Sequence, residues 1–146
     1  MVRYAVERWG SAGGEFDQVW CVSDVDDYRD LDEAVRYAEN HGVELVLSNP
    51  CFELWLLLHH VDHRKWLAGY PAVKELLRKH VRVPADKSVA FERDFGGERW
   101  WRAADRARAL APEGEEHQRN PSTRMWRLAF AISGERPDES EAAEPR

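Results

Sequence analysis

The chain has 146 residues and a hydrophobic content of 43%, which suits one globular domain of ordinary size. Its formal net charge is −6, and the body (residues 1–134) and the last twelve residues contribute −3 each. This balance excludes a protein that binds nucleic acid through bulk positive charge, so a polyanion would have to be held by a local patch or by metal ions.

Signals for secretion and for membrane insertion are missing from the sequence. The first fourteen residues lack the apolar core of a signal peptide, and the longest apolar run, LWLLL at 54–58, is far too short to span a bilayer. Cys21 and Cys51 stand in apolar surroundings without zinc-type spacing, which indicates buried, reduced thiols. We therefore expect a cytoplasmic protein.

The N-terminal half is typical of a βαβ unit. Residues 1–9 suit the end of a helix or an edge strand, and residues 10–17 suit a loop. Residues 19–23 are apolar on both faces, as central parallel strands are. Residues 31–40 have helical spacing, and residues 43–47 form a second short strand. Such a unit is right-handed with parallel strands by default.

The rest of the chain is predicted to be helical. Asn49 and Pro50 suit the N-cap and the first position of a helix that is apolar almost all round. Further helices are predicted at 65–80, at 88–110 with a break at Gly96-Gly97, and at 122–132. Within the apolar helix the side chains predicted to be buried are Phe52, Trp55, Leu56 and Leu58.

The fold class follows from these elements. We expect an α/β domain with a small parallel sheet, flanking helices and a helix-rich C-terminal half. Residues 1–134 form this single domain. Residues 135–146 are charged and lack large apolar side chains, which predicts a disordered acidic tail.

The stretch VWCVSDVDDY, residues 19–28, begins as a predicted buried strand and has three aspartates in its second half. Asp24 and Asp26 project from the same side if the strand continues. Close carboxylates repel unless a cation lies between them, and oxygen ligands without histidine favour magnesium or manganese over zinc. Ligands of open α/β sheets bind beyond the carboxyl ends of the strands. The alternative is that Asp24 or Asp27 caps the following helix or shapes the loop.

Two further features leave alternatives open. Glu53 is the only charged residue in the segment 51–60. It either faces solvent at the first helical turn, where the helix dipole stabilises it, or turns toward the aspartate pair. His59 and His63 are one helical turn apart, a spacing that can bind zinc, but no HExxH pattern is present. We interpret these histidines as residues that lie near the carbonyls of a helix end.

These residues resemble a known family. The stretch at 19–28, the run AVRYAENHGVELVLSNPCFELWLLLHH at 34–60, Lys87 in PADKS and the motif NPST at 120–123 resemble the RloB-like family, over about Val19 to Phe130. Proteins of this family are associated with bacterial phage defence and are often encoded beside an ATPase. They are regarded as divergent Toprim domains, the fold of topoisomerase and primase catalytic cores.

The resemblance implies a Toprim-type, metal-dependent nuclease of an abortive-infection system that acts on nucleic acid with an AAA- or ABC-type ATPase partner. The Toprim DxD pair matches Asp24 and Asp26, and the SNPCFE block ends at Glu53. These three carboxylates are the expected catalytic ligands of Mg²⁺ or Mn²⁺, and Lys87 is expected to add a positive contact. The ions would activate attack on a phosphodiester. DNA and RNA substrates both remain open.

One element of the Toprim pattern is missing. Such domains begin with a strand that ends in Glu-Gly, whereas the only glutamates before Asp24 are Glu7 and Glu15, and glycine follows neither. We therefore expect weak metal binding, activity that is low or dependent on the partner, and an exposed sheet edge that favours a partner or a homodimer.

Two other functions compete with the nuclease. The first is a catalytically degenerate RloB-like subunit that serves the ATPase as a scaffold or sensor. The second is a phosphotransferase of the haloacid dehalogenase kind, which also carries a DxD after its first strand. The chain lacks a convincing final acidic pair for that class.

Overall fold

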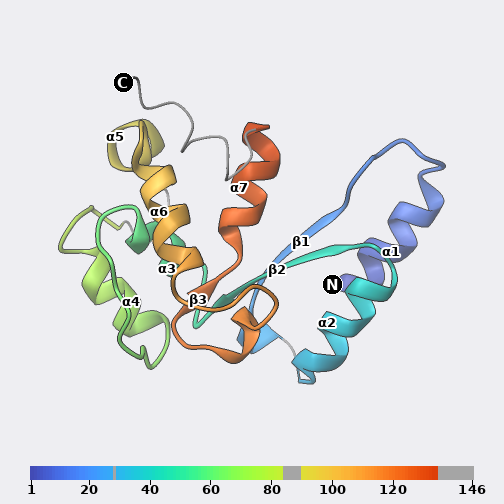
Figure 1. Cartoon of the computed structure of the whole chain (residues 1–146), viewed down its shortest axis with the longest axis horizontal. Helices are drawn as coiled ribbons and strands as arrows, with labels where there is room; N and C mark the ends of the chain where they lie inside the picture. Colours follow the sequence, from blue (N-terminus) through green and yellow to red (C-terminus); the bar gives the residue numbers. More distant parts are fainter. Residues whose placement is uncertain (28, 84–89, 135–146) are drawn as a thin grey trace, which may run out of the picture.

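The computed structural model describes residues 1–27, 29–83 and 90–134. Its elements in chain order are α1 (Val2–Ser11), β1 (Trp20–Asp24), the 3₁₀ helix η1 (Val25–Asp27), α2 (Leu31–Asn40), β2 (Glu44–Asn49), α3 (Glu53–Leu58), α4 (Tyr70–Leu77), α5 (Phe91–Phe95), α6 (Arg99–Arg108), the 3₁₀ helix η2 (Glu116–Gln118), β3 (Ser122–Thr123) and α7 (Met125–Ser133). Helix clearly exceeds strand, as predicted (Figure 1). The predicted tail, 135–146, lies outside the described residues.

The sheet has three strands in the order β1-β2-β3. β1 and β2 are parallel, with Asp24 opposite Ser48, and α2 connects them, which confirms the predicted βαβ unit. β3 pairs antiparallel with the end of β2, where Ser48 faces Thr123 and Asn49 faces Ser122. The sheet is therefore mixed, and the prediction of parallel pairing is correct only for its two longer strands. Among the described strands β1 lies at an edge of the sheet, whereas the apolar residues 19–23 were interpreted as typical of a central strand.

The NPST motif differs from its prediction. The helix expected from Ser122 begins only at Met125, because the preceding residues form β3. The hydroxyls of Thr123 and Ser48 lie 2.8 Å apart in a buried hydrogen bond. The Thr123 hydroxyl also accepts a hydrogen bond of 3.2 Å from the N–H of Met125, so it contacts both the sheet and the start of α7. The SNP and NPST motifs therefore meet, and both carry their Asn-Pro bond in the cis form.

The apolar helix is shorter than predicted. Asn49 is the last residue of β2 and not a helix cap, since α3 begins at Glu53 after a turn. Trp55 and Leu58 are buried as expected. Phe52 is 37% exposed and Leu56 is partly exposed, so the prediction of burial is wrong for these two side chains.

The predicted glycine break separates α5 from α6. A Cβ atom on Gly96 would lie 2.5 Å from the carbonyl oxygen of Glu92. Gly97 has a φ of +69°, in the left-handed region that side chains other than glycine rarely adopt. Both positions therefore require glycine, and the long helix predicted at 88–110 becomes two.

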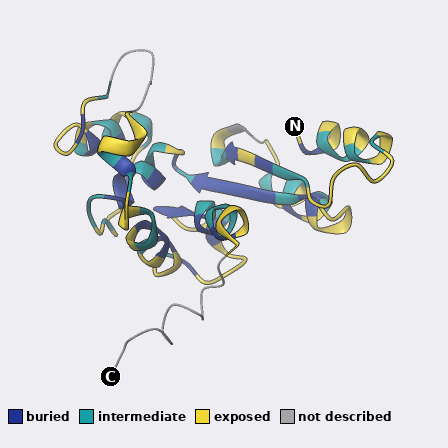
Figure 2. Cartoon of the chain, turned by 90° about the horizontal axis from the view of Figure 1, so that it is seen from above, coloured by how far each residue is buried: buried dark blue, intermediate teal, exposed yellow. Residues whose placement is uncertain are grey.

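Buried apolar residues form two main cores. Figure 2 marks the buried residues in dark blue. The first core packs α1 and α2 against the β1–β2 pair. The second packs α3 against α4, α6 and α7, and a smaller cluster joins it to α5. Strand β2 runs from the first core to the second, and its carboxyl end is followed by α3 (Figure 1). In the described part of the chain, no helix has the length and apolar character that crossing a bilayer requires.

Candidate metal centre

The carboxyl edge of the sheet brings the end of β1 to the start of α3. Asp24 is the last residue of β1, and its Oδ1 accepts a hydrogen bond of 2.7 Å from the backbone N–H of Phe52, the N-cap residue of α3. The first N–H groups of a helix have no partner within the helix. Asp24, at the end of β1, is the partner of one such N–H at the start of α3. The following helix, α2, is capped by Asp30, whose Oδ1 accepts a hydrogen bond of 2.9 Å from the N–H of Glu33.

The thiol of Cys51 is buried and is affected by the charges of both Asp24 and Glu53. Cys51 is 4% exposed. Burial raises the pKa of its thiol to about 12, helped by the nearby Glu53 carboxylate, which also accepts a hydrogen bond from the thiol, and by the negative charge of Asp24. The thiol is therefore protonated at neutral pH. Both carboxylates therefore act on the Cys51 thiol, and the hydrogen bond of Asp24 to the Phe52 N–H brings Asp24 to the residue between Cys51 and Glu53.

Two further residues were predicted for this site, Asp26 as a metal ligand and Lys87 as a positive contact. Asp26 lies in η1 with its side chain exposed, and Lys87 lies outside the described residues. Within residues 1–27, 29–83 and 90–134, no three His, Cys, Asp or Glu side chains are placed to hold one ion together. A hydrated magnesium ion keeps several waters and needs only one or two carboxylates from the protein, so a set of fewer than three does not conflict with its chemistry. Asp24 and Glu53 would supply these carboxylates, with Asp26 acting through water.

The histidine cluster is structural. His59 is buried, and its Nδ1 lies 2.8 Å from the carbonyl oxygen of Trp55, one turn earlier. Burial lowers the pKa of His59 and also that of His60, whose ring stacks on His80. His63 contacts the carbonyl oxygen of Lys65 at 2.9 Å instead of joining His59. The interpretation that these residues lie near helix-end carbonyls is therefore confirmed for His59, whereas the carbonyl that His63 contacts belongs to the loop after α3.

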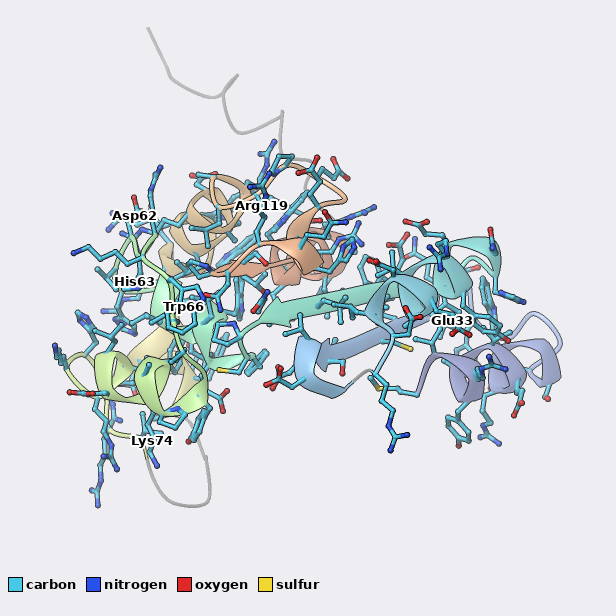
Figure 3. All side chains as sticks on the ribbon, turned by 90° about the horizontal axis from the view of Figure 1, so that it is seen from below. Glu33, Asp62, His63, Trp66, Lys74 and Arg119 are labelled. Carbon is cyan, nitrogen blue, oxygen red and sulfur yellow. The ribbon has the colours of Figure 1, made fainter. Side chains whose placement is uncertain are left out.

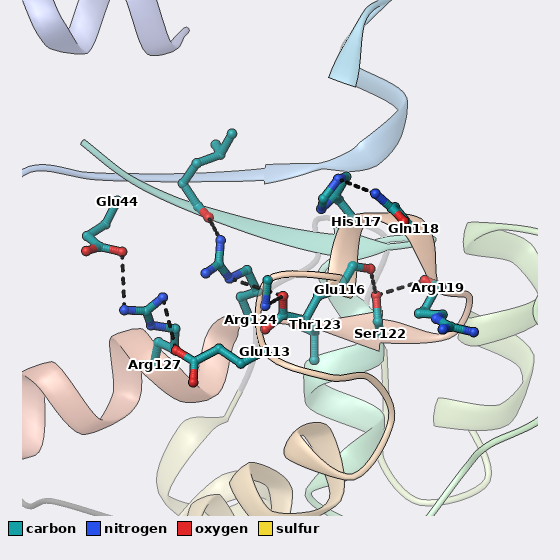
Figure 4. Close-up of polar contacts among 12 residues, drawn as sticks. Glu44, Glu113, Glu116, His117, Gln118, Arg119, Ser122, Thr123, Arg124 and Arg127 are labelled. Carbon is teal, nitrogen blue, oxygen red and sulfur yellow. Dashed lines mark hydrogen bonds and ion pairs between the residues drawn. The ribbon is translucent and has the colours of Figure 1, made fainter. Parts of the chain in front are cut away.

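The sequence analysis did not predict a buried ion pair between η2 and the start of α7. Glu116 is 1% exposed, and its Oε2 accepts a hydrogen bond of 2.7 Å from the N–H of Gly114 and lies 3.5 Å from Nε of Arg124 (Figure 4). Nothing in the sequence separates Glu116 from its neighbour Glu115, which pairs with Arg119 at 3.1 Å on the surface. The pair fixes η2 against the start of α7.

The same segment carries further polar contacts (Figure 4). The hydroxyl of Ser122 donates to the carbonyl oxygen of Glu116. On α7, Arg127 lies 3.7 Å from a carboxylate oxygen of Glu44 and 3.5 Å from one of Glu113. Strand β3 is therefore held at the edge of the sheet largely by polar groups.

Comparison with known proteins identifies the family. The family model described as RloB-like protein matches residues 1–132. The chain belongs to the RloB-like family. The match takes in α1 as well as the stretch from Val19 to Phe130 that carries the resemblance. Neither a curated protein nor a solved structure matches the chain.

In this RloB-like protein the motifs that resemble the family converge. The DxD pair begins at the end of β1, the SNPCFE block spans the end of β2 and the start of α3, and NPST contains β3. All three meet at the carboxyl end of β2, although they are far apart in the sequence. The α/β class with flanking helices is the one that the resemblance implies.

Proposed function

We propose that this RloB-like protein is a Toprim-type, metal-dependent nuclease subunit of a bacterial antiphage system that works by abortive infection with an AAA- or ABC-type ATPase partner. The observation that best supports a nuclease is the convergence of Asp24 and Glu53 at the carboxyl edge of the sheet, where α/β proteins bind ligands. Asp24 and Glu53 would hold Mg²⁺ or Mn²⁺, with Asp26 reaching it through water and Lys87 meeting the phosphate. When bound, the ion supplies a Lewis acid for the charge on the phosphate oxygens.

The chain's own groups orient these carboxylates. The N–H of Phe52 fixes Oδ1 of Asp24, so the carboxylate is aimed before an ion arrives. The Cys51 thiol donates a hydrogen bond to Glu53 and holds it in the same way. Because the pKa of this thiol is about 12, Cys51 is not a thiolate nucleophile at neutral pH. Its role is to position Glu53.

A degenerate subunit is the second candidate. It is favoured by the observation that the described residues hold no group of three metal-ligating side chains. Such a subunit would keep the fold and serve the ATPase as a scaffold or sensor. The two proposals differ in whether the chain cleaves a phosphodiester.

A nuclease assay separates them. The purified chain is incubated with nucleic acid and Mg²⁺ or Mn²⁺, alone and with the ATPase encoded beside it. We expect metal-dependent cleavage that is weak alone, rises with the partner and disappears in Asp24→Asn. A matched control, Asp105→Asn, changes an exposed aspartate of α6 and should keep the activity. Absence of cleavage under every condition would contradict the nuclease and support the scaffold.

A further inference from the structure

A second surface of the molecule carries an exposed indole. Trp66 is 70% exposed, in the loop between α3 and α4. Tryptophan usually buries a large apolar area, although single exposed hydrophobic residues are ordinary on protein surfaces. The exposure of Trp66 is therefore not by itself a sign of a binding site. The residues around this side chain are the grounds for the inference.

The backbone beside Trp66 is fixed. The next residue, Leu67, is buried in the larger core. Asn120 clamps it from both sides, because its Nδ2 donates to the Leu67 carbonyl at 2.8 Å and its Oδ1 accepts from the Leu67 N–H at 3.0 Å. Before Trp66, the carbonyl oxygen of Lys65 lies 2.9 Å from Nε2 of His63. The loop thus presents the indole from an ordered backbone, which lowers the entropy cost of binding a partner.

The segment that carries Trp66 is basic although the chain is acidic. Residues 59–83 hold six lysines and arginines and two acids, a net charge of +4, whereas the whole chain carries −6. The basic residues are Arg64, Lys65, Lys74, Arg78, Lys79 and Arg82. All are exposed except Lys74, which is partly exposed. One of the two acids, Asp62, is paired with Arg64 at 3.0 Å. This local charge complements an anionic ligand.

Two aromatic residues, Trp66 and Tyr70, stand between these cations in the sequence. Nζ of Lys74 lies 5.5 Å from the ring centroid of Tyr70. Trp66, His63 and Lys74 lie at one end of the molecule and Glu33 at the other (Figure 3). Proteins that bind single-stranded nucleic acid combine cations that meet the phosphates with aromatic faces on which bases stack. A protein partner could also contact an exposed tryptophan, but it would not require the cations around it.

The Trp66 loop is anchored at the edge that carries the candidate metal centre. Asn120, which clamps the loop, lies two residues before Ser122, and Ser122 pairs with Asn49 at the carboxyl end of β2. Asp24 pairs with Ser48, the residue before Asn49. The backbone of the loop is therefore tied to the segment that pairs with the carboxyl end of β2.

We propose that the basic loop surface, defined by Arg64, Lys65, Trp66, Tyr70 and Lys74, binds single-stranded nucleic acid. One base stacks on Trp66, and the phosphates on either side meet the cations. A duplex offers no free base face to Trp66 and binds less tightly. The inference rests on the proposed nuclease function only in that the bound strand would be its substrate.

The test measures binding without cleavage. Fluorescence anisotropy follows a labelled single strand of about 12 nucleotides, a length within the usual site sizes, in the presence of EDTA. Trp66→Ala should weaken binding roughly 5- to 100-fold, as loss of one stacked base does, and Trp66→Phe should retain part of the affinity. Lys74→Gln should lower the slope of log K against log salt by about 0.7, the value for one phosphate contact on a single strand.

Two controls keep the test specific. Ile132→Ala removes another exposed apolar side chain, on α7, and Arg3→Gln removes a cation on α1 that pairs with Glu33 at 3.3 Å. Both should bind like the wild type. Unchanged affinity in Trp66→Ala would overturn the proposal. Equal affinity for a duplex, or no binding by the wild type, would also overturn it.

The outcome is separable from that of the proposed function. Asp24→Asn should lose cleavage and keep binding in EDTA. If the chain never cleaves but still binds single strands through Trp66, the nuclease proposal fails and this inference stands.

Discussion

At the scale of single residues, the carboxylate of Asp24 has one observed structural contact and one proposed functional contact. The alternative role that the sequence offered for Asp24, a cap on the following helix, falls to Asp30. The hydrogen bond of Asp24 to the Phe52 N–H is the structural contact, and it joins the end of β1 to the start of α3. The proposed metal contact is the functional one. Both need a carboxyl oxygen at this position, but only the metal contact needs its negative charge.

Substitution separates these two roles. Asp24→Ala removes the acceptor for the Phe52 N–H and should lower the free energy of unfolding by about 1–2 kcal/mol, as loss of a helix cap does. Asp24→Asn keeps an oxygen acceptor and should lose clearly less. Urea unfolding of both variants measures the difference. Equal losses would show that the hydrogen bond does not depend on the side-chain oxygen.

At the scale of elements, much of the fold was predictable because apolar periodicity is local. The sequence predicts α2 at its observed bounds, and β1 and β2 with ends shifted by one or two residues. It could not predict β3, because two residues carry no period, and Thr123 is extended only through its contacts with Ser48 in β2.

The candidate site shows the same limit. Position at a strand end predicts that Asp24 lies at the carboxyl edge of the sheet. Whether Glu53 turns toward it depends on three-dimensional packing around Cys51, which no spacing encodes. The burial of Glu116 beside the exposed Glu115 likewise depends on Arg124, and this arginine arrives from a different element.

Helix α3 should depend on Trp55 and hardly on Phe52. Trp55 is 6% exposed in the larger core, whereas Phe52, three residues earlier, is 37% exposed. Trp55→Ala should lower the free energy of unfolding by about 3–5 kcal/mol, the usual cost of a large-to-small change in a core. Phe52→Ala is the matched control and should cost about 1 kcal/mol or less, because surface changes are small. A melting midpoint unchanged by Trp55→Ala would show that α3 is peripheral.

The junction of η2 with α7 should depend on the buried ion pair. Arg124→Met leaves the buried charge of Glu116 without its cation and should cost about 3–5 kcal/mol. Replacing both residues, as Arg124→Met with Glu116→Gln, should restore much of the loss. The control Arg119→Met breaks a surface pair and should cost about 1 kcal/mol or less. Chemical denaturation measures all three. Equal costs for the two single arginine variants would contradict the account.

At the scale of the whole molecule, the proposed functions depend on residues that are far apart in the sequence and close together in the fold. The family's motifs come together at one edge of the sheet, and the Trp66 loop is clamped to that edge by Asn120. Within the described residues no strand pairs with the outer edge of β1. Such an edge favours a partner subunit or a homodimer, and this stays a prediction. A net negative protein with a basic loop would hold its substrate locally, and the metal would complete the attraction.

The central claim is that Asp24 and Glu53 hold a divalent ion, and calorimetric titration with Mn²⁺ tests it most directly. We expect weak, saturable binding to the wild type, clearly reduced binding to Asp24→Asn, Glu53→Gln and Asp24→Asn/Asp26→Asn, and unchanged binding to the control Asp105→Asn. These variants lose negative charge, but Asn at position 24 keeps an oxygen acceptor for the Phe52 N–H. A smaller binding heat therefore shows loss of Mn²⁺ binding and not loss of the folded structure. Equal heats from the wild type and the carboxylate variants would mean that these residues only join the strand to the helix.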